Sequence, residues 1–224
     1  MKLRSVLYLC IVVLLGTSCK TTKAVSPYPT MIADVEPFSV GTVNAAIDRT
    51  FSPGVHGVKV DVVFYPRTNE VGLEFVHGVS PYKQFWDQAG RQQFVQAINR
   101  YIDDFANRNL STKYSRTRTV YGKVNGHFHW KPIPVSLTYK SSPVFELGYR
   151  FKDKAPYFSV VQRAAAEETK NQKDRITEST QYSLYFTRAQ GEEMIRLFDQ
   201  ALLVVSLGDL SAPVAKTAPD RDVY

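Results

Sequence analysis

The stretch HGVKVDVVFYPRTNEVGLEFVH, residues 56–77, decides the fold of this chain. In residues 56–65 apolar side chains occupy every second position, and the same alternation returns in residues 70–77. Because successive side chains of a strand point to opposite faces, this period of two predicts two strands that are each buried on one face. The turn-forming residues 66–69 between them predict a β-hairpin.

A long amphipathic helix is expected directly after this hairpin, over residues 81–107. Ser80 can cap the free N–H groups of a first helical turn, and Pro81 suits the first helical position. Apolar residues then recur at steps of three and four, as a helix with one buried side requires.

A second helix is expected over residues 188–203. Thr187 and Gln190 have the spacing of a capping box at its start. Alternating apolar residues predict three strands between the two helices, over residues 144–152, 157–163 and 181–186.

A second hairpin is expected around Asn125-Gly126. This dipeptide is the strongest two-residue hairpin signal, because both positions of the turn need a positive φ. Its strands would be residues 113–124 and 127–137.

Together these elements predict an α+β fold in which two helices cover one face of an antiparallel sheet of about six to eight strands. The opposite face carries polar side chains and would be solvated or would bind a partner. The expected organisation is a signal peptide (1–18), a lipid-anchored tether (19–54), a single globular domain (55–207) and a flexible tail (208–224).

Both cysteines of the chain, Cys10 and Cys19, lie within its first twenty residues. The body that follows therefore has no cysteine for a disulfide, a CxxC redox site, zinc ligation or nucleophilic catalysis. Hydrophobic residues make up 44% of the chain and charged residues 22%, which is typical of a globular domain.

Residues 1–18 have the order of a secretory signal peptide: a positively charged start, the apolar residues 6–15, and then small residues. The segment LLGTSC, residues 14–19, resembles the lipobox of bacterial lipoproteins. Gly16 stands where many lipoboxes have leucine, and spirochaete and Bacteroidetes lipoproteins have loose boxes of this kind.

The resemblance implies that the signal is cleaved before Cys19 and that this cysteine carries lipid, with palmitate among the acyl chains. The protein would then be anchored to a membrane of the cell envelope, which we expect to be the outer membrane, with its domain in the periplasm or at the surface. The alternative is an ordinary secretory signal in which Cys19 is incidental. The resemblance leaves the family of the domain open.

A basic stretch with interleaved aromatic residues runs from Lys113 to Lys131, in a chain of net charge +7. An exported protein is not expected to bind nucleic acid, so the cations fit an anionic glycan or an envelope protein better. The alternative is an edge strand protected by its charges. The candidate surface consists of Arg116, Arg118, Lys123 and Trp130.

The sequence His127-Phe128-His129 places two imidazoles on the same face of a strand. Such a pair can bind zinc, copper or nickel, although a catalytic zinc site needs a third protein ligand. The alternative is a solvated polar strand face. The pair therefore stands as a metal-binding hypothesis, and no cofactor is assigned.

No GxSxG, P-loop, GxGxxG or HExxH motif occurs in the chain, and no catalytic residue is assigned. We expect a non-enzymatic envelope lipoprotein that binds a partner protein or an anionic polymer, in an oligomeric state that the sequence leaves open. The alternative is a hydrolase of cell-wall or glycan substrates, which needs two carboxylates in a cleft. The strand-borne acids are Asp61, Glu70, Glu74 and Glu146.

Overall fold

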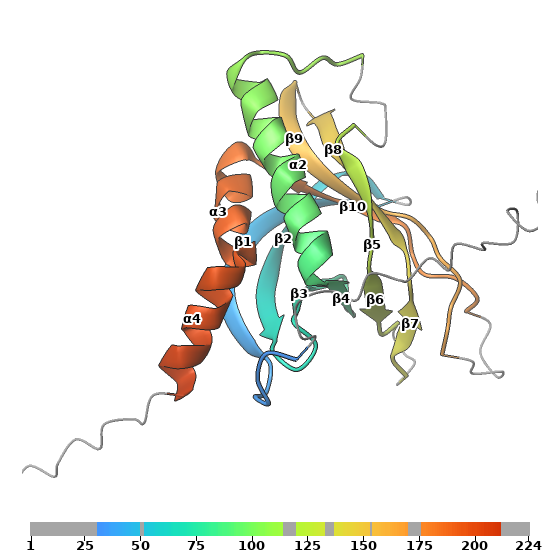
Figure 1. The fold of residues 1–224 in the computed structure, drawn as a ribbon. Helices are drawn as coiled ribbons and strands as arrows, with labels where there is room; N and C mark the ends of the chain where they lie inside the picture. Colours follow the sequence, from blue (N-terminus) through green and yellow to red (C-terminus); the bar gives the residue numbers. More distant parts are fainter. Residues whose placement is uncertain are drawn as a thin grey trace, which may run out of the picture.

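The computed structural model describes residues 31–49, 52–113, 120–132, 137–152, 154–169 and 176–211. In this part of the chain ten strands form one antiparallel sheet, accompanied by three helices (Figure 1). The α+β class and the antiparallel sheet are confirmed. The expectation of six to eight strands and two helices is wrong, because one additional strand lies in the expected tether, another lies at the expected start of the first helix, and the second predicted helix is divided in two.

The strands follow the order β5-β8-β9-β10-β1-β2-β3-β4-β6-β7 across the sheet. Their bounds are β1 Phe38–Arg49, β2 Ser52–Tyr65, β3 Glu70–His77, β4 Ser80–Trp86, β5 Gly122–Asn125, β6 His127–Trp130, β7 Tyr139–Ser141, β8 Val144–Lys152, β9 Ala155–Gln162 and β10 Tyr182–Phe186. The helices are α2 Gln88–Ala106, α3 Arg188–Phe198 and α4 Gln200–Ser211. The three strands expected between the helices are therefore confirmed as β8, β9 and β10.

The hairpin predicted from residues 56–77 is confirmed as β2 and β3. The two strands are antiparallel, with Val60 opposite Phe75 and Val62 opposite Leu73. These apolar residues are buried, as their alternation predicts. At the turn, Asn69 takes a φ of 54°, a left-handed conformation that asparagine tolerates better than most residues.

Strand β1 lies in the segment that we expected to be a tether, and it occupies the middle of the sheet between β10 and β2. Its inward residues Val43, Ala45 and Ile47 are buried. The alternation of apolar and polar residues in this strand is weak, because Gly41, Ala45 and Ala46 are small residues that mark neither face clearly. Central placement, rather than strong local β-propensity, holds this strand in the sheet.

Ser80 and Pro81 begin strand β4, so the predicted helix start is wrong. The helix begins seven residues later, where Asp87 is the N-cap and its carboxylate accepts a hydrogen bond from the Gly90 amide at 2.6 Å. Residues 80–86 form a strand because they pair with β3 on one side and with β6 on the other, and the end of the strand is buried from Gln84 to Trp86.

The second predicted helix is divided in two. Its capping box is confirmed, since Thr187 and Gln190 exchange both hydrogen bonds. Asp199 breaks the helix with an extended backbone and caps α4 by accepting a hydrogen bond from the Leu202 amide at 3.0 Å. Helix α4 then runs to Ser211, past the expected end of the domain.

Asn125-Gly126 does not form a hairpin. Strand β5 pairs with β8 and strand β6 pairs with β4, and neither residue of the dipeptide has a positive φ. Gly126 is the one residue between these strands, which lie in opposite arms of the sheet. The sheet must therefore curl until its two arms lie one residue apart.

The curling makes one face of the sheet an interior. Across it, the Gln84 amide of β4 donates to Gln162 of β9 at 3.4 Å, and the rings of Phe75 and Tyr182 lie 5.5 Å apart. Helices α2 and α3 pack on this same face (Figure 1). Their contact with the sheet is an aromatic cluster formed by Trp86, Phe94, Phe145, Phe158 and Phe198.

Among the described residues, no helix has the length and apolar character needed to cross a membrane.

Replacing Gly126 should test the curled arrangement. A Cβ atom at this position would lie 2.3 Å from Phe145 Cε2 and 2.8 Å from the Phe85 carbonyl oxygen. We expect Gly126→Val to lower the free energy of unfolding by about 1–3 kcal/mol through overpacking. The measurement is urea denaturation followed by circular dichroism.

Gly57→Ala provides the control, because a Cβ there meets no atom within 4 Å. Equal stability of Gly126→Val and the wild-type chain would contradict the close approach of the two arms.

Candidate functional site

A row of charged side chains crosses the outer face of the sheet, the face turned away from α2 and α3. Strand pairing sets Glu74 of β3 beside Lys83 of β4, Lys83 beside His129 of β6, and His129 beside Lys140 of β7. Side chains directly opposite on neighbouring strands lie within contact distance. The row therefore brings an acid, two lysines and a histidine together.

A pocket of about 590 Å³ opens next to this row, and we call it the outer pocket. Tyr65, Phe85 and His129 form aromatic walls, while Glu70, Lys83 and Lys131 contribute charged groups. This volume lies in the range of small-ligand sites.

The aromatic walls of the outer pocket are held in place by contacts with one another. The ring centroids of Tyr65 and Phe85 are 5.1 Å apart, and those of Phe85 and His129 are 4.7 Å apart. The Tyr65 hydroxyl donates to the Glu74 carboxylate, which also forms an ion pair with Lys83 at 2.9 Å. Burial and the Glu74 carboxylate raise the pKa of Tyr65 above its ordinary value, so this wall stays protonated.

His129 is half-buried in the wall of the outer pocket. Burial, and then the positive charges of Lys140, His127 and Lys83, lower the pKa of His129 to about 4. The imidazole is therefore neutral at pH 7. A neutral imidazole can donate one hydrogen bond and accept another, and it adds no charge to the surrounding lysines.

The exposed lysines around the outer pocket leave an excess of positive charge. Lys131 lines the pocket and Lys140 flanks His129, and both side chains are exposed. Neither belongs to an ion pair within the part of the chain that the structure describes. An anion at the outer pocket would therefore meet Lys131 in the lining and Lys140 nearby, neither of them held by a carboxylate in the described ranges, with Glu70 as the one acid of the lining.

Only two of the four residues predicted to form a binding surface, Lys123 and Trp130, belong to the described part of the chain. Arg116 and Arg118 lie outside the described residues, as does Cys19. Lys123 is exposed on β5, but its ammonium group lies 3.7 Å from the buried carboxylate of Glu146, which Arg163 also binds. Its charge is thus shared with an ion-pair network.

Trp130 belongs mainly to the interior. It is 4% exposed, and its ring stacks on Phe128 and Tyr139 at centroid distances of 5.4 and 5.5 Å. Trp130 borders the outer pocket without presenting an open stacking surface. Phe85, at 7% exposed, is also largely buried, so Tyr65 is the more accessible aromatic side chain of the pocket.

His127 and His129 lie on the same outer face of β6, as the alternation predicts. His127 Nδ1 is 3.4 Å from the Ser142 hydroxyl, whereas His129 lies against Phe85. No group of three or more histidine, cysteine, aspartate or glutamate side chains able to hold a metal ion occurs among the described residues.

Three of the four acids considered for hydrolysis already have partners. Glu74 binds Lys83 and Tyr65, Asp61 accepts a hydrogen bond from Thr42 at 2.9 Å, and Glu146 binds Arg163. Glu70 lines the outer pocket together with His129. The pocket therefore contains one acid and one neutral imidazole.

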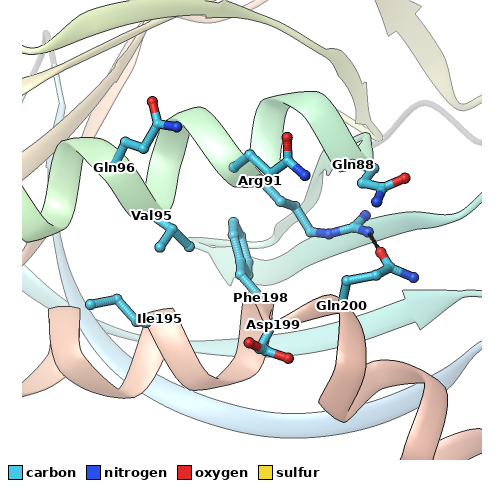
Figure 2. A pocket seen from close by; sticks show the side chains of 9 residues that line it. Gln88, Arg91, Val95, Gln96, Ile195, Phe198, Asp199 and Gln200 are labelled. Atoms are coloured by element: carbon cyan, nitrogen blue, oxygen red, sulfur yellow. Dashed lines mark hydrogen bonds between the residues drawn. The ribbon is translucent and has the colours of Figure 1, made fainter. Parts of the chain in front are cut away.

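A second pocket, of about 330 Å³, lies between α2 and the junction of α3 with α4 (Figure 2), and we call it the inter-helix pocket. Its distinctive residue is Arg91, whose side chain is 1% exposed. Figure 2 shows the guanidinium of Arg91 reaching from α2 toward Gln200, with Phe198 between the helices and Val95 on the far side of Phe198.

Arg91 holds four neutral oxygen atoms. Nη1 donates to the carbonyls of Asn69 and Trp86 at 2.7 and 3.1 Å, and Nη2 donates to Asn69 Oδ1 at 3.0 Å and to Gln200 Oε1. Its Nε is buried and has no partner among the described residues. Burial lowers the pKa of Arg91 to about 10, so the guanidinium remains charged at neutral pH.

Arg91 was not predicted as a site residue, although the sequence contains a signal for it. Arg91 precedes Phe94, Ile98 and Tyr101 at steps of three and four, so it occupies the apolar stripe of its helix. A single arginine on the apolar side of a helix is expected to have its charged group buried in the interior. The residues that complete its surroundings, Asn69 and Gln200, are remote in sequence.

The neutral state of His129 can be tested by following its imidazole resonances by NMR from pH 8 to pH 3. We expect a midpoint near 4. Lys140→Ala should raise this midpoint, because the variant removes a positive charge that opposes protonation. Lys154→Ala, in the β8–β9 turn, is the control for a general charge effect.

The sign of the linked stability change follows from this midpoint. An unfolded histidine has a pKa of about 6.5. Unfolding therefore takes up a proton between pH 6.5 and 4, and this group should lower the stability of the fold as the pH falls through that window. A midpoint near 6.5 in the folded chain would contradict the burial of His129 against Phe85.

Comparison with known proteins gives one match. A family model described as "Uncharacterised Treponema protein" matches residues 38–204. No curated protein and no solved structure matches the chain. The matched segment begins at the first residue of β1 and ends within α4, so it includes the curled sheet, both pockets and Arg91. The chain belongs to this family of uncharacterised Treponema proteins.

Proposed function

We propose that this protein is a lipid-anchored lipoprotein of the cell envelope that binds an acidic glycan in the outer pocket. The observation that carries the proposal is the pairing of aromatic walls with lysines that have no acidic partner in the described part of the chain. Sugar rings lie well on aromatic faces, and carboxylate groups on a glycan would meet Lys131 and Lys140.

The geometry of the outer pocket supports binding of extended polymers. It lies on an exposed sheet face, where Lys131 and Lys140 extend the positive charge beyond the rim. The neutral imidazole of His129 can hydrogen-bond a hydroxyl group, and the Glu74–Lys83 pair holds the Tyr65 wall through the Tyr65 hydroxyl. An acidic envelope protein is the alternative ligand for the same charges.

The lipid anchor is supported by the lipobox-like segment that ends at Cys19. The description of the family adds support, because Treponema is a spirochaete genus and the loose box resembles those of spirochaete lipoproteins. Multiple acyl chains would hold the protein stably on a membrane, since each buried CH₂ group contributes about 0.8 kcal/mol.

A second candidate function draws on the same pocket. Glu70 and His129 both line it, and a carboxylate with a neutral imidazole can serve general acid–base chemistry. A hydrolase that acts on the bound glycan would use these two residues. The two functions differ in whether the polymer is cut.

Retention on immobilised polygalacturonate, with neutral dextran as the reference, tests glycan binding. The double variant Lys131→Gln/Lys140→Gln should bind about three- to tenfold more weakly, because each exposed charge contributes at most about 1 kcal/mol. Binding of the wild-type chain should weaken as salt increases.

The control variant Arg108→Gln/Lys154→Gln removes the same charge from the exposed residues after α2 and in the β8–β9 turn. Equal loss of retention in both double variants would show that net charge alone is responsible and would refute the site. Release of soluble fragments by the wild type, but not by His129→Gln, would instead support the hydrolase.

Lipidation is tested by mass spectrometry of the N-terminal peptide from the envelope fraction. We expect a mature chain that starts at Cys19 and carries acyl groups. Cys19→Ala should leave an unanchored or uncleaved form. An unmodified Cys19 within a soluble mature chain would favour the ordinary secretory signal.

A further inference from the structure

Asp87 and Glu70 act on the charge of Arg91 from a distance, but no carboxylate among the described residues lies within ion-pair distance of it. All four contacts of its Nη atoms are with neutral oxygens, and none of the ion pairs among the described residues includes it. A buried charge is costly unless an opposite charge balances it. The site around Arg91 is therefore suited to an anion.

The inter-helix pocket next to Arg91 has a mixed lining. Val95, Ile195 and Phe198 supply apolar surface. The polar surface is mostly amide, because four glutamines line the pocket: Gln88, Gln92, Gln96 and Gln200. Amides donate and accept hydrogen bonds without adding charge, so they can bind both donor and acceptor groups of a ligand.

We infer that this pocket binds a small organic monocarboxylate, with the carboxylate on Arg91 and the apolar body on Phe198. A guanidinium holds a carboxylate through two parallel hydrogen bonds, and the donors Nε and Nη2 form one such fork. Nε is unpartnered, and Nη2 is held by the amide oxygen of Gln200.

Gln200 occupies the position that one carboxylate oxygen would take. It is the first residue of α4, directly after the helix break at Asp199. Its amide oxygen satisfies Nη2 as a neutral acceptor, and a ligand carboxylate would displace it. Binding therefore exchanges a neutral acceptor for a charged one, which forms the stronger hydrogen bond with a guanidinium.

The other charged residue of the pocket restricts the ligand to one negative charge. Asp199 lines the same space, and its carboxylate caps α4 through the Leu202 amide. A second anionic group on the ligand would be repelled by this carboxylate. The volume of about 330 Å³ lies at the lower end of the range for ligand sites and fits a small molecule better than a polymer.

The inference can be tested by calorimetric titration of the purified full-length chain with phenylacetate and with phenylacetamide. The two probes have the same shape and differ in charge. We expect saturable binding of phenylacetate and at least about tenfold weaker binding of phenylacetamide. Inorganic phosphate serves as a second anion without an apolar body and should bind more weakly than phenylacetate.

Three variants locate the binding site. Arg91→Lys keeps the charge but loses the fork, and it should weaken phenylacetate binding about tenfold. Gln200→Ala removes the competing amide, and it should bind phenylacetate as tightly as the wild type or more tightly. Val95→Trp fills the pocket without changing Arg91, so it should abolish binding even if the Arg91 variant fails to fold.

The matched control is Arg100→Gln, which removes an exposed positive charge from the same helix and should leave binding unchanged. Equal affinities for phenylacetate and phenylacetamide, tighter binding of phosphate, no binding of phenylacetate, or unchanged binding in Val95→Trp would each overturn the inference. Because the outer pocket plays no part in it, this test is independent of glycan binding.

Discussion

One short connection shapes this molecule: Gly126 alone joins β5 and β6, although these strands belong to opposite arms of the ten-stranded sheet. A flat sheet cannot bring its arms within one residue of each other. The sheet therefore curls, and the absence of a Cβ at Gly126 lets its backbone fit between Phe145 and the Phe85 carbonyl. Curling divides the molecule into an interior face and an outer face.

The interior face determines the surroundings of Arg91. Helix α2 packs over the aromatic cluster, and its apolar stripe includes this one guanidinium. Arg91 Nη1 donates to the carbonyl of Asn69 in the β2–β3 turn and to the carbonyl of Trp86 at the end of β4. Arg91 therefore joins helix α2 to the sheet. The break at Asp199 separates α3 from α4, and Gln200, the first residue of α4, accepts a hydrogen bond from the guanidinium. The link between helix and sheet is thus made through neutral oxygen atoms, with no carboxylate of the described residues at ion-pair distance from Arg91.

Strand β4 connects the two pockets. Its residues alternate between the faces, so Lys83 and Phe85 line the outer pocket while the Trp86 carbonyl accepts a hydrogen bond from Arg91 on the inner side. The outer pocket combines lysines and aromatic rings on the outer face of the sheet. The inter-helix pocket is smaller, and its lining combines four glutamine amides with three apolar and two charged side chains. The two sites thus differ in size and charge.

Local patterns in the sequence determined the β2–β3 hairpin, the capping box at Thr187 and the common face of His127 and His129, because each depends on residues close together in the chain. Tertiary structure decided the rest. β1 is a central strand because of its neighbours, residues 80–86 pair with β3 and β6 instead of forming a helix, and Asn125-Gly126 joins two arms instead of making a turn. Periodicity encodes which side of a segment is buried, whereas strand partners and the contacts of Arg91 depend on residues far apart in sequence.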